Sequence, residues 1–450
     1  MTAPLDRRNF LALGGAGLGA LALGACSGPA VTTPGGGGSA SAAADTDWSN
    51  VKPAAEISFW SNHPGKSKDV ETALIEKFHK AQSDTKVTLV TAGANYEEVA
   101  QKFQTAQQGG QLPHLVVFSD VWWFRYFIND SIIPLDGLIK KLDWKTSDYV
   151  DGLYKDYSYN GKQWAMPYAR STPLFYYNKD MFKAAGLEDR APKTWAEFAE
   201  WAPKIKAANP SIQFAHMYPA ASDYDSWSLQ NKIWGEGGQL SKDWDITCDS
   251  AEVVKVLQFT QDSVYKDKWA GVSAKDAAAD FSSGAVASFV GSTGSLVGVL
   301  SAAKFNVGVG FLPGGSKATD MVCPTGGAGL GIPKNITKEQ QLAAANFLKF
   351  LGEPENTVAF SDATGYMPVR KSADMSAIIA KRPQAKVAVD QLAHTRAQDY
   401  ARVFLPGGDR EIGMASADIL TQKADPKERL AKLKTTLTGI YTNDVKPKLK

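Results

Sequence analysis

Apolar and polar positions follow two patterns along most of the chain, and these patterns predict strands that alternate with helices. Residues 57–60, 87–91 and 115–118 are short apolar runs, typical of buried strands. Between them, residues 70–82 and 96–107 place apolar side chains three and four positions apart, which predicts amphipathic helices. A strand–helix–strand order predicts a parallel sheet, and ligands of such sheets bind beyond the carboxyl ends of the strands.

The same two patterns continue through the rest of the chain. Further strands are expected at residues 164–167, 174–177, 286–290 and 305–311, and a short run follows Gly326 and Gly327 at 330–332. Helices are expected to dominate residues 179–265, and another begins after Gly294. The tail from residue 338 is predicted to be helical apart from turns at 364–368 and 405–409.

The first 25 residues have the pattern of an export signal. Arg7 and Arg8 precede a short apolar run that ends in small residues before Cys26, which is typical of a twin-arginine signal followed by lipidation of that cysteine. A plain secretory signal with an incidental cysteine is the alternative. Residues 26–53 are rich in Gly, Ser and Ala, so we expect a flexible tether. The predicted location is extracytoplasmic, with a lipid anchor on the outer face of the cell membrane.

Composition narrows the classes of protein. The 450 residues are 44% hydrophobic and 21% charged, which is globular rather than disordered. With 49 basic and 47 acidic residues, the net charge of +2 predicts no nucleic-acid partner. Three cysteines are too few for a disulfide scaffold or a multi-cysteine zinc site. Beyond Cys26, only Cys248 and Cys323 remain, and they could pair or stay free.

The motifs for catalysis are weak. Residues 243–247 fit the Asp-x-Asp-x-Thr pattern of aspartyl phosphatases, but residues 237–242 before them do not read as the buried strand that this chemistry needs. The five histidines are scattered, and the sequence has neither a phosphate-binding P-loop nor a nucleophile elbow. We therefore predict a binding protein without a cofactor or metal, and not an enzyme. An extracytoplasmic phosphodiester hydrolase is the remote alternative.

Several segments carry a resemblance to a known family. Residues 171–179, 192–198 and 306–315 resemble the extracellular solute-binding proteins of ABC importers (family 1), in the sugar-binding branch. Further segments are similar to the Ugp-type binders of glycerol 3-phosphate and glycerophosphocholine, in their actinobacterial form. These segments are residues 120–124, 171–173, 292–296, 364–368 and 398–410.

The resemblance implies an α/β, two-lobed periplasmic-binding-protein fold of the maltose-binding-protein-like type II, in which each lobe is a mostly parallel sheet flanked by helices. The expected first lobe comprises residues 54–169 and 286–325, and the second comprises 170–285 and 326–450. A ligand cleft between the lobes would close by a hinge motion. The implied partners are an ABC permease and its ATPase, and the chain is expected to be a monomer.

The resemblance also implies a set of ligand-binding residues. They are Tyr96, Asp120, Ser171, Tyr224, Trp227, Ser292, Gly327, Tyr366 and Arg402. Arg402 matches the arginine that contacts the phosphate, and a guanidinium suits a phosphate diester by charge and paired donors. Ser292 precedes an expected helix, whose free N–H groups would also suit a phosphate, although an ordinary N-cap is the alternative. Gly327 would let the backbone approach the ligand closely, or simply form a turn.

The remaining residues would contact the glycerol and head-group parts of the ligand. Ser171 and Tyr366 match positions that donate hydroxyl groups, and Asp120 could accept bonds from glycerol hydroxyls, face an ammonium group or cap a helix. Tyr96, Tyr224 and Trp227 could form an aromatic wall for choline. Trp122 and Trp123 are expected to pack in the core instead.

Tyr224 occupies a position where other family members carry Trp or Leu and where selectivity is expected to be set. The favoured ligand is glycerophosphocholine. The alternatives are glycerol 3-phosphate and an oligosaccharide.

Overall fold

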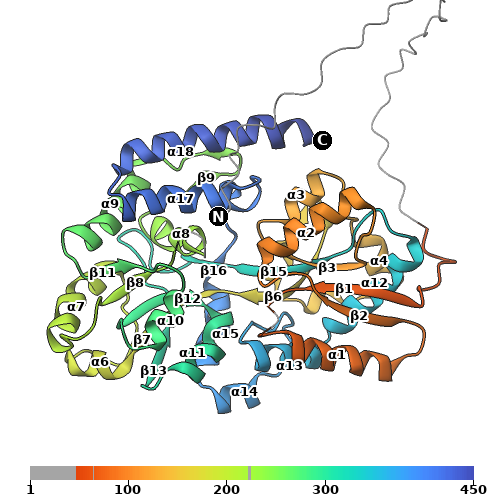
Figure 1. The fold of residues 1–450 in the computed structure, drawn as a ribbon, viewed down its shortest axis with the longest axis horizontal. Helices are drawn as coiled ribbons and strands as arrows, with labels where there is room; N and C mark the ends of the chain where they lie inside the picture. The colour runs from red at the N-terminus through yellow and green to blue at the C-terminus, as the bar shows by residue number, and fades with distance from the viewer. Residues whose placement is uncertain (1–46, 64, 221–223, 450) are drawn as a thin grey trace, which may run out of the picture. The chain divides into compact units, whose positions relative to one another are not determined.

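The folded part of the chain begins earlier than predicted. A computed structural model describes residues 47–63, 65–220 and 224–449, shown in Figure 1. The predicted signal, Cys26 and most of the predicted tether lie outside the described residues. Within the last part of that tether, Trp48 is only 7% exposed and fills the space beside Gly137. Because burial of an indole is strongly favourable, it extends the fold upstream of the predicted boundary at residue 54.

Five strands form the first sheet, in the order β2-β1-β3-β15-β6. They are β1 (Glu56–Ser61), β2 (Lys86–Thr91), β3 (Leu115–Ser119), β6 (Met166–Ser171) and β15 (Gly326–Gly331). β1 pairs in parallel with β2 and β3, whereas β15 is antiparallel to both β3 and β6. Four of the five strands therefore run in one direction, as expected for a mostly parallel sheet.

The second sheet repeats this design in the order β11-β8-β12-β7-β13. Its strands are β7 (Pro173–Asn178), β8 (His216–Tyr218), β11 (Ala270–Val272), β12 (Ser288–Ser292) and β13 (Val307–Gly310). β8 is parallel to β11 and β12, and β7 is antiparallel to β12 and β13. Again one strand, here β7, runs antiparallel to the other four. β8 and β11 were not predicted, because three residues are too few to show a strand period.

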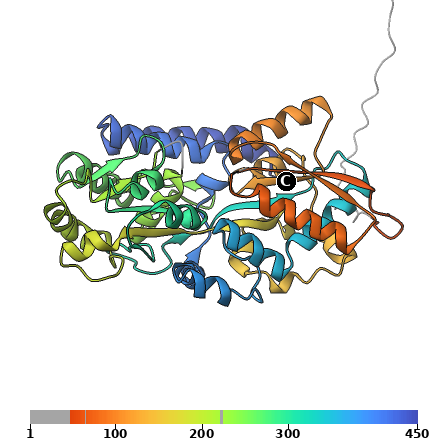
Figure 2. The ribbon, with the colours of Figure 1, turned by 60° about the horizontal axis from the view of Figure 1, so that its bottom comes forward.

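Helices cover both faces of the first sheet. They are α1 (Lys68–Ala81), α2 (Tyr96–Gly109), α3 (Trp123–Ile128), α4 (Asp136–Lys141), α5 (Asp151–Lys155), α12 (Lys338–Leu351) and α13 (Pro354–Thr364), with the turn η1 (Thr146–Asp148) and the hairpin β4 (Ser158–Tyr159) and β5 (Lys162–Gln163). In Figure 1, α2 and α3 lie above this sheet and α1 and α13 below it. Figure 2 brings α1 to the front, and α1 contacts β2, α12 and α13.

The second sheet and the C-terminal segment carry the other helices. They are α6 (Lys179–Ala184), α7 (Trp195–Ala208), α8 (Asp225–Gly235), α9 (Ala251–Tyr265), α10 (Ala277–Ser282), α11 (Leu296–Ala302), α14 (Ser376–Lys381), α15 (Gln384–Gln391), α16 (Tyr400–Val403), α17 (Gly408–Thr421) and α18 (Pro426–Ile440). Short 3₁₀ helices are η2 (Thr293–Ser295), η3 (Leu392–His394) and η5 (Lys446–Lys448), and η4 (Tyr441–Val445) is a π-helix. Short strands are β9 (Ser241–Lys242), β10 (Asp245–Ile246), β14 (Cys323–Pro324) and β16 (Thr395–Arg396). No helix among the described residues is long and apolar enough to cross a membrane.

The chain crosses between the two sheets twice. Thr172 alone separates β6 of the first sheet from β7 of the second, and residues 311–325, which include β14, lead from β13 back to β15. This corrects the predicted division into lobes. Residues 286–325 supply β12 and β13 to the second sheet, whereas the stretch that begins at residue 326 supplies β15 to the first. These strands differ from the prediction because long-range pairing, which local pattern does not encode, decides which sheet a strand joins. The later part of 326–450 packs on second-sheet elements as expected, since α17 contacts α8 and α9.

The two cysteines outside the signal do not pair. Cys248 and Cys323 are both buried and free. The Cys323 thiol lies 4.0 Å from the carbonyl oxygen of Pro173, and the Cys248 thiol lies 3.9 Å from that of Leu430. Burial raises the pKa of both thiols. They behave as small apolar groups in the core rather than as reactive thiols.

A buried carboxyl group lies under the first sheet. Glu71 in α1 is 2% exposed and accepts hydrogen bonds from the hydroxyls of Ser61, at 2.5 Å, and Tyr168, at 3.0 Å. Burial raises the pKa of Glu71 to about 7, although the two hydroxyl donors oppose the shift. Since this folded-state pKa lies above the ordinary value of 4.5, the neutral form contributes stability below pH 4.5 that is lost as the pH rises through 7.

Glu71→Gln is therefore expected to stabilise the protein at pH 8 and to change little at pH 5. Glutamine keeps the accepting oxygen but never ionises, so the gain at pH 8 approaches the cost of ionising Glu71, about 3 kcal/mol. Urea unfolding at the two pH values measures it. Glu76→Gln, on the exposed side of the same helix, is the matched control and should be neutral at both. Equal stability of Glu71→Gln and the parent at pH 8 would contradict the expectation.

Candidate functional site

A buried polar cluster lies where the two sheets meet. Asp120 directly follows β3, at the carboxyl end of the strand, and its N–H donates to the carbonyl oxygen of Gly327 at 2.9 Å. Asp120 and Arg402 are each 7% exposed, and a distance of 3.3 Å joins Asp120 Oδ2 to Arg402 Nη1. Arg402 comes from α16 in the C-terminal segment, so the tertiary structure joins residues 282 positions apart.

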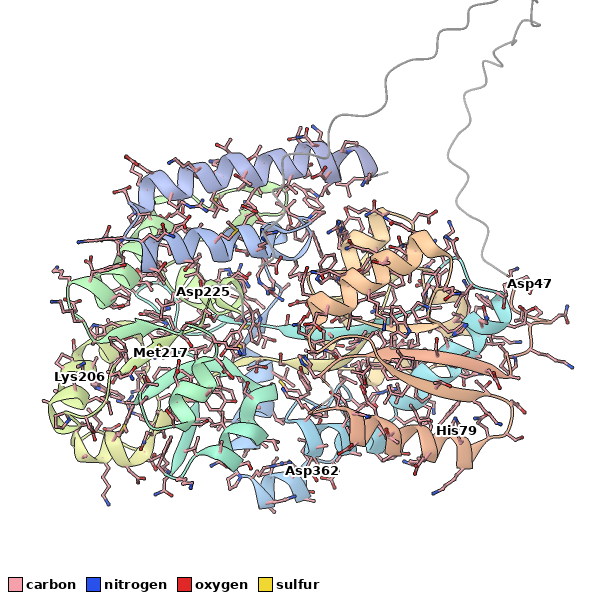
Figure 3. All side chains as sticks on the ribbon, in the orientation of Figure 1. Asp47, His79, Lys206, Met217, Asp225 and Asp362 are labelled. Carbon is pink, nitrogen blue, oxygen red and sulfur yellow. The ribbon has the colours of Figure 1, made fainter. Side chains whose placement is uncertain are left out.

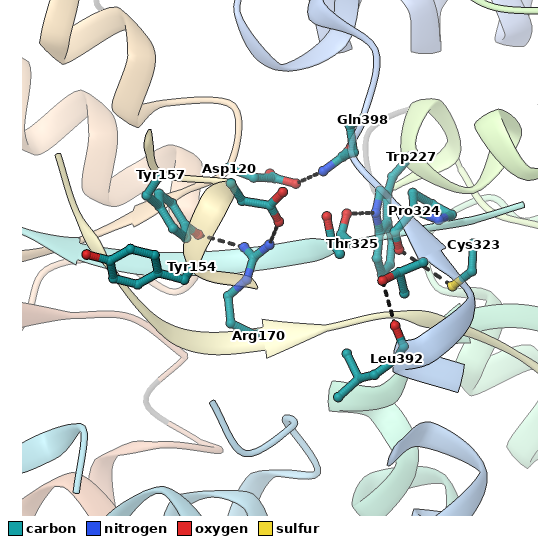
Figure 4. Close-up of polar contacts among 12 residues, drawn as sticks. Asp120, Tyr154, Tyr157, Arg170, Trp227, Cys323, Pro324, Thr325, Leu392 and Gln398 are labelled. Carbon is teal, nitrogen blue, oxygen red and sulfur yellow. Dashed lines mark hydrogen bonds and ion pairs between the residues drawn. The ribbon is translucent and has the colours of Figure 1, made fainter. Parts of the chain in front are cut away.

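Gln398 connects the two charged groups. Its Nε2 donates to Asp120 Oδ2 at 2.5 Å, as Figure 4 shows, and its Oε1 accepts from Arg402 Nη1. Gln230 in α8 donates to the same Oε1 at 3.0 Å. The side-chain amide of Gln398 therefore hydrogen-bonds to both the Asp120 carboxylate and the Arg402 guanidinium. Gln398 is not among the predicted ligand-binding residues, because a neutral side chain carries little signal of its own.

Contacts with α8 and β9 fix the backbone beside Arg402. Asp399 accepts from the indole N–H of Trp234 at 3.2 Å and from the N–H of Leu240 at 2.7 Å. Arg402 Nε donates to Ser226 Oγ at 3.2 Å, in the first turn of α8, next to Asp225, which Figure 3 labels. These contacts leave the guanidinium little freedom, so it is preorganised toward Asp120.

A second buried ion pair lies beside the first. Arg170 in β6 is fully buried; its Nη2 pairs with Asp156 and its Nη1 donates to Tyr157 Oη at 2.6 Å (Figure 4). Burial raises the pKa of Asp156 to about 6, and the Arg170 guanidinium opposes this shift. Both cations of the cluster thus face a carboxylate inside the protein.

Two tyrosines meet on the first-sheet side. Tyr96, at the start of α2, and Tyr366, after α13, bring their hydroxyl oxygens to 3.0 Å. His63 lies edge-on to the ring of Tyr96, with centroids 5.0 Å apart. Burial, together with the neighbouring Tyr366, raises the pKa of Tyr96, so its hydroxyl stays a donor. Both predicted tyrosines therefore lie in one polar patch.

The two predicted aromatics of α8 lie together. Trp227 Nε1 donates to the carbonyl oxygen of Thr325 at 2.9 Å (Figure 4), and its indole packs so closely on Gly326 that a side chain there would clash. Tyr224 meets Trp227 edge to face at 6.2 Å and donates to the carbonyl oxygen of Val290 at 3.4 Å. Trp227 is therefore fixed against Thr325 and Gly326, where β15 begins.

Ser292 has the role of an ordinary N-cap. Its Oγ accepts from the N–H of Gly294 at 3.0 Å, at the start of η2, and α11 follows. Ser171 is buried at the end of β6, paired with Gly326. Gly327 has a φ of +96°, and its conformation leaves no space for a Cβ beside the carbonyl oxygen of Ala169. The backbone therefore requires glycine at this position.

Other polar atoms near the cluster have no hydrogen-bond partner among the described residues. They are Ser119 Oγ at the end of β3, Thr293 Oγ1 in η2 and Arg170 Nε. Since buried polar groups are nearly always bonded, these atoms are available to a polar ligand. The side chain of Asn62, after β1, interacts with Tyr96. The strand-end rule singles out Asn62 from the sequence and could also have found Ser119, whereas nothing in the local sequence marks Thr293.

Trp123 and the phosphatase-like segment at residues 243–247 were also the subject of predictions. Trp123 is fully buried against Phe124 and Phe404, which confirms its expected core role. Asp243, the first residue of the phosphatase-like pattern, lies exposed in the turn between β9 and β10, and not at the end of a buried strand. No group of three or more acidic, histidine or cysteine residues that could hold a metal occurs among the described residues.

A hollow of about 560 Å³ lies elsewhere, on the surface beside α6 and β13. Its charged lining includes Lys179, which pairs with Asp189 at 2.6 Å. None of the predicted ligand-binding residues lines it. The buried cluster, which joins both sheets and holds paired charges, is the stronger candidate for a ligand site.

Two mostly parallel sheets, joined by crossing strands with a polar cluster between them, define a periplasmic-binding-protein fold. Residues 73–387 match the family model of the bacterial extracellular solute-binding proteins. The chain therefore belongs to this family, and it is a Ugp-type solute-binding protein of an ABC importer.

Individual relatives agree with this assignment. The chain is 42% identical to UgpB from Mycobacterium tuberculosis, solved in complex with glycerophosphocholine, with a TM-score of 0.83 over 87% of this chain and 100% of that one. It is 30% identical to the sn-glycerol-3-phosphate-binding periplasmic protein UgpB of Yersinia enterocolitica, over 81% of this chain and 86% of the relative. The GacH receptor of Streptomyces glaucescens, solved with and without acarbose, has a TM-score of 0.75 at 22% identity over 87% of this chain and 100% of that one, which supports the maltose-binding-protein-like fold alone.

Proposed function

We propose that this chain captures glycerophosphodiesters, glycerophosphocholine first, and delivers them to the permease of its importer. The buried Asp120–Arg402 pair carries the proposal, because the two residues come from opposite sides of the cluster and compensate one another. A ligand with both a phosphate and a quaternary ammonium group exchanges this internal pair for two ligand contacts. Phosphate then faces Arg402, ammonium faces Asp120, and no charge stays buried without a partner.

The other predicted residues have matching roles in this proposal. Tyr96, Tyr224 and Trp227 offer aromatic surface for the choline methyl groups, where each good contact is worth about 0.5–2 kcal/mol. Ser171, Ser292 and Tyr366 supply hydroxyl groups, and Gly327 holds the backbone that positions Asp120. The UgpB of M. tuberculosis, solved with glycerophosphocholine, supports this choice of ligand.

Glycerol 3-phosphate is the second candidate, favoured by the names of the enterobacterial relatives. It carries phosphate without a cation, so it would separate Arg402 from Asp120 and leave that carboxylate without a positive partner. An oligosaccharide has only neutral hydroxyl groups, so it would offer no opposite charge to either Asp120 or Arg402. A phosphodiester hydrolase would need a nucleophile or a metal-activated water, and the exposed position of Asp243 gives that chemistry no support. We therefore propose binding without catalysis.

The remaining parts of the proposal concern location and motion. A twin-arginine signal would direct export, and lipidation of Cys26 would anchor the folded part to the outer face of the cell membrane. The two crossings between the sheets, at Thr172 and through residues 311–325, are suited to a hinge between two lobes that close on the ligand. The protein would work as a monomer that docks on the permease, whose ATPase drives transport.

Calorimetric titration of the purified protein tests the ligand class. Glycerophosphocholine is expected to give saturable heat at one site, glycerol 3-phosphate weaker binding and maltose none. Heat from maltose alone would show a sugar binder instead. A parallel assay follows free choline over hours, and sustained release would make the protein a hydrolase.

A further inference from the structure

Lys66 brings a third cation to the predicted site. It lies in the connection between β1 and α1, at the carboxyl end of a first-sheet strand. Its Nζ donates to the carbonyl oxygen of Gly294 at 2.6 Å and lies 5.2 Å from the ring centroid of Tyr366. Gly294 belongs to η2, next to Ser292, and its Cα packs against the Tyr366 ring. The ammonium group therefore links the first-sheet side to the second, between two of the predicted ligand-binding residues.

The partners of Lys66 differ from those of the other two cations. Arg402 faces Asp120 and Arg170 faces Asp156, so each guanidinium has a carboxylate. No carboxylate of residues 47–63, 65–220 and 224–449 forms an ion pair with Lys66. A partly buried ammonium with a carbonyl and an aromatic face as neighbours still has donors and charge for an anion.

We propose that Lys66 is a specificity-determining residue that adds a positive charge beside Tyr366 and the η2 turn, where Ser292 is expected to contact the phosphate. This rests on the proposed function and goes beyond it. The Asp120–Arg402 pair suits a ligand without net charge, whereas Lys66 strengthens binding of every phosphate ligand in proportion to its negative charge. Lys66 thus decides how far the site also accepts glycerol 3-phosphate, whose phosphate monoester carries more negative charge than a diester.

The location of Lys66 supports this role over a purely structural one. The side chain is only partly buried, and its hydrogen bond goes to one backbone carbonyl, so the apo fold depends little on it. The groups around it, Tyr366 and the η2 turn, are those proposed to contact the ligand. Loss of the ammonium should therefore change affinity and selectivity while leaving the stability of the ligand-free protein almost unchanged.

Lys66→Met keeps the length of the side chain and removes its charge. We expect glycerophosphocholine to bind about tenfold more weakly by calorimetry, and glycerol 3-phosphate to lose more than that. Lys68→Met is the matched control, because Lys68 is exposed two positions further along; both affinities should stay within about twofold of the parent. Lys66→Arg keeps the charge and should recover most of the binding.

Thermal unfolding gives the second measurement. Without ligand, Lys66→Met should melt close to the parent, and its ligand-induced rise in Tm should be smaller. Parental affinities for both phosphate ligands in Lys66→Met would overturn the role of Lys66 while leaving the proposed function intact. An equal loss for both ligands would overturn its part in selectivity. A parent protein that binds neither phosphate ligand would overturn both proposals.

Discussion

Arg402→Met is expected to abolish most of the binding of glycerophosphocholine. The substitution keeps the aliphatic volume and removes the cation that the phosphate would face. Truncating one partner of a buried, hydrogen-bonded charge pair costs about 2–5 kcal/mol, which is a loss of roughly 30-fold or more in affinity. Calorimetric titration measures this loss. Arg410→Met is the control, since Arg410 lies exposed eight positions further along the same segment and should bind as the parent does.

A change in stability accompanies this substitution, and a second variant separates it from binding. Without Arg402, the buried Asp120 keeps Gln398 as a donor but loses its positive partner, so the variant should unfold more easily. The double variant Asp120→Asn with Arg402→Met removes both charges and should recover much of that stability. It should still fail to bind glycerophosphocholine. Recovery of ligand binding in the double variant, or parental affinity in Arg402→Met, would remove Arg402 from the site.

Gly327→Ala is expected to have the largest effect on folding. The φ of +96° at Gly327 is strained for any residue with a Cβ, and that atom would lie 2.1 Å from the carbonyl oxygen of Ala169. The backbone of two paired strands must therefore shift. We expect a loss of about 3 kcal/mol in the free energy of unfolding, measured in urea. Any folded fraction should also bind ligand weakly, because the carbonyl of Gly327 holds the N–H of Asp120.

The control for this prediction is another glycine with the opposite expectation. Gly298 lies in α11, and a Cβ added there meets no atom within 4 Å. Gly298→Ala should therefore stabilise the protein by about 0.5–1 kcal/mol, since alanine restricts the unfolded chain and favours a helix. If Gly327→Ala unfolded within 1 kcal/mol of the parent, the close packing of β15 on β6 would not be the constraint described here.

The candidate site was visible in the sequence only where a residue carries a strong chemical signal. Asp120 and Arg402 could be named because charged residues in a family motif suggest ligand contacts, and the structure brings them within 3.3 Å. Gln398 could not be named, although it bonds to both, because an amide is neutral and common at surfaces. Lys66 was missed for a related reason: a lysine near a helix start usually lies in solvent.

Local pattern determined the first three strands and the helices between them. Residues 57–60 became β1, residues 115–118 became β3, and residues 70–82 became α1, each within about two positions. Here the side-chain period and the final environment agree, because each element buries the face that its own sequence makes apolar. The resemblance to the family added the two-sheet architecture, which no single segment contains.

The tertiary structure alone decided β15 and, with it, the site. The sequence showed only a short run at residues 330–332, because Gly326–Gly331 has little intrinsic preference for a strand. Pairing with β3 on one side and β6 on the other creates the strand, and the rings of Phe118 and Tyr157 leave room for nothing larger than glycine at two of its positions. Hydrophobic period is a property of neighbours in sequence, whereas a strand's partners, a buried ion pair and a crossing between sheets are properties of residues that meet only after folding.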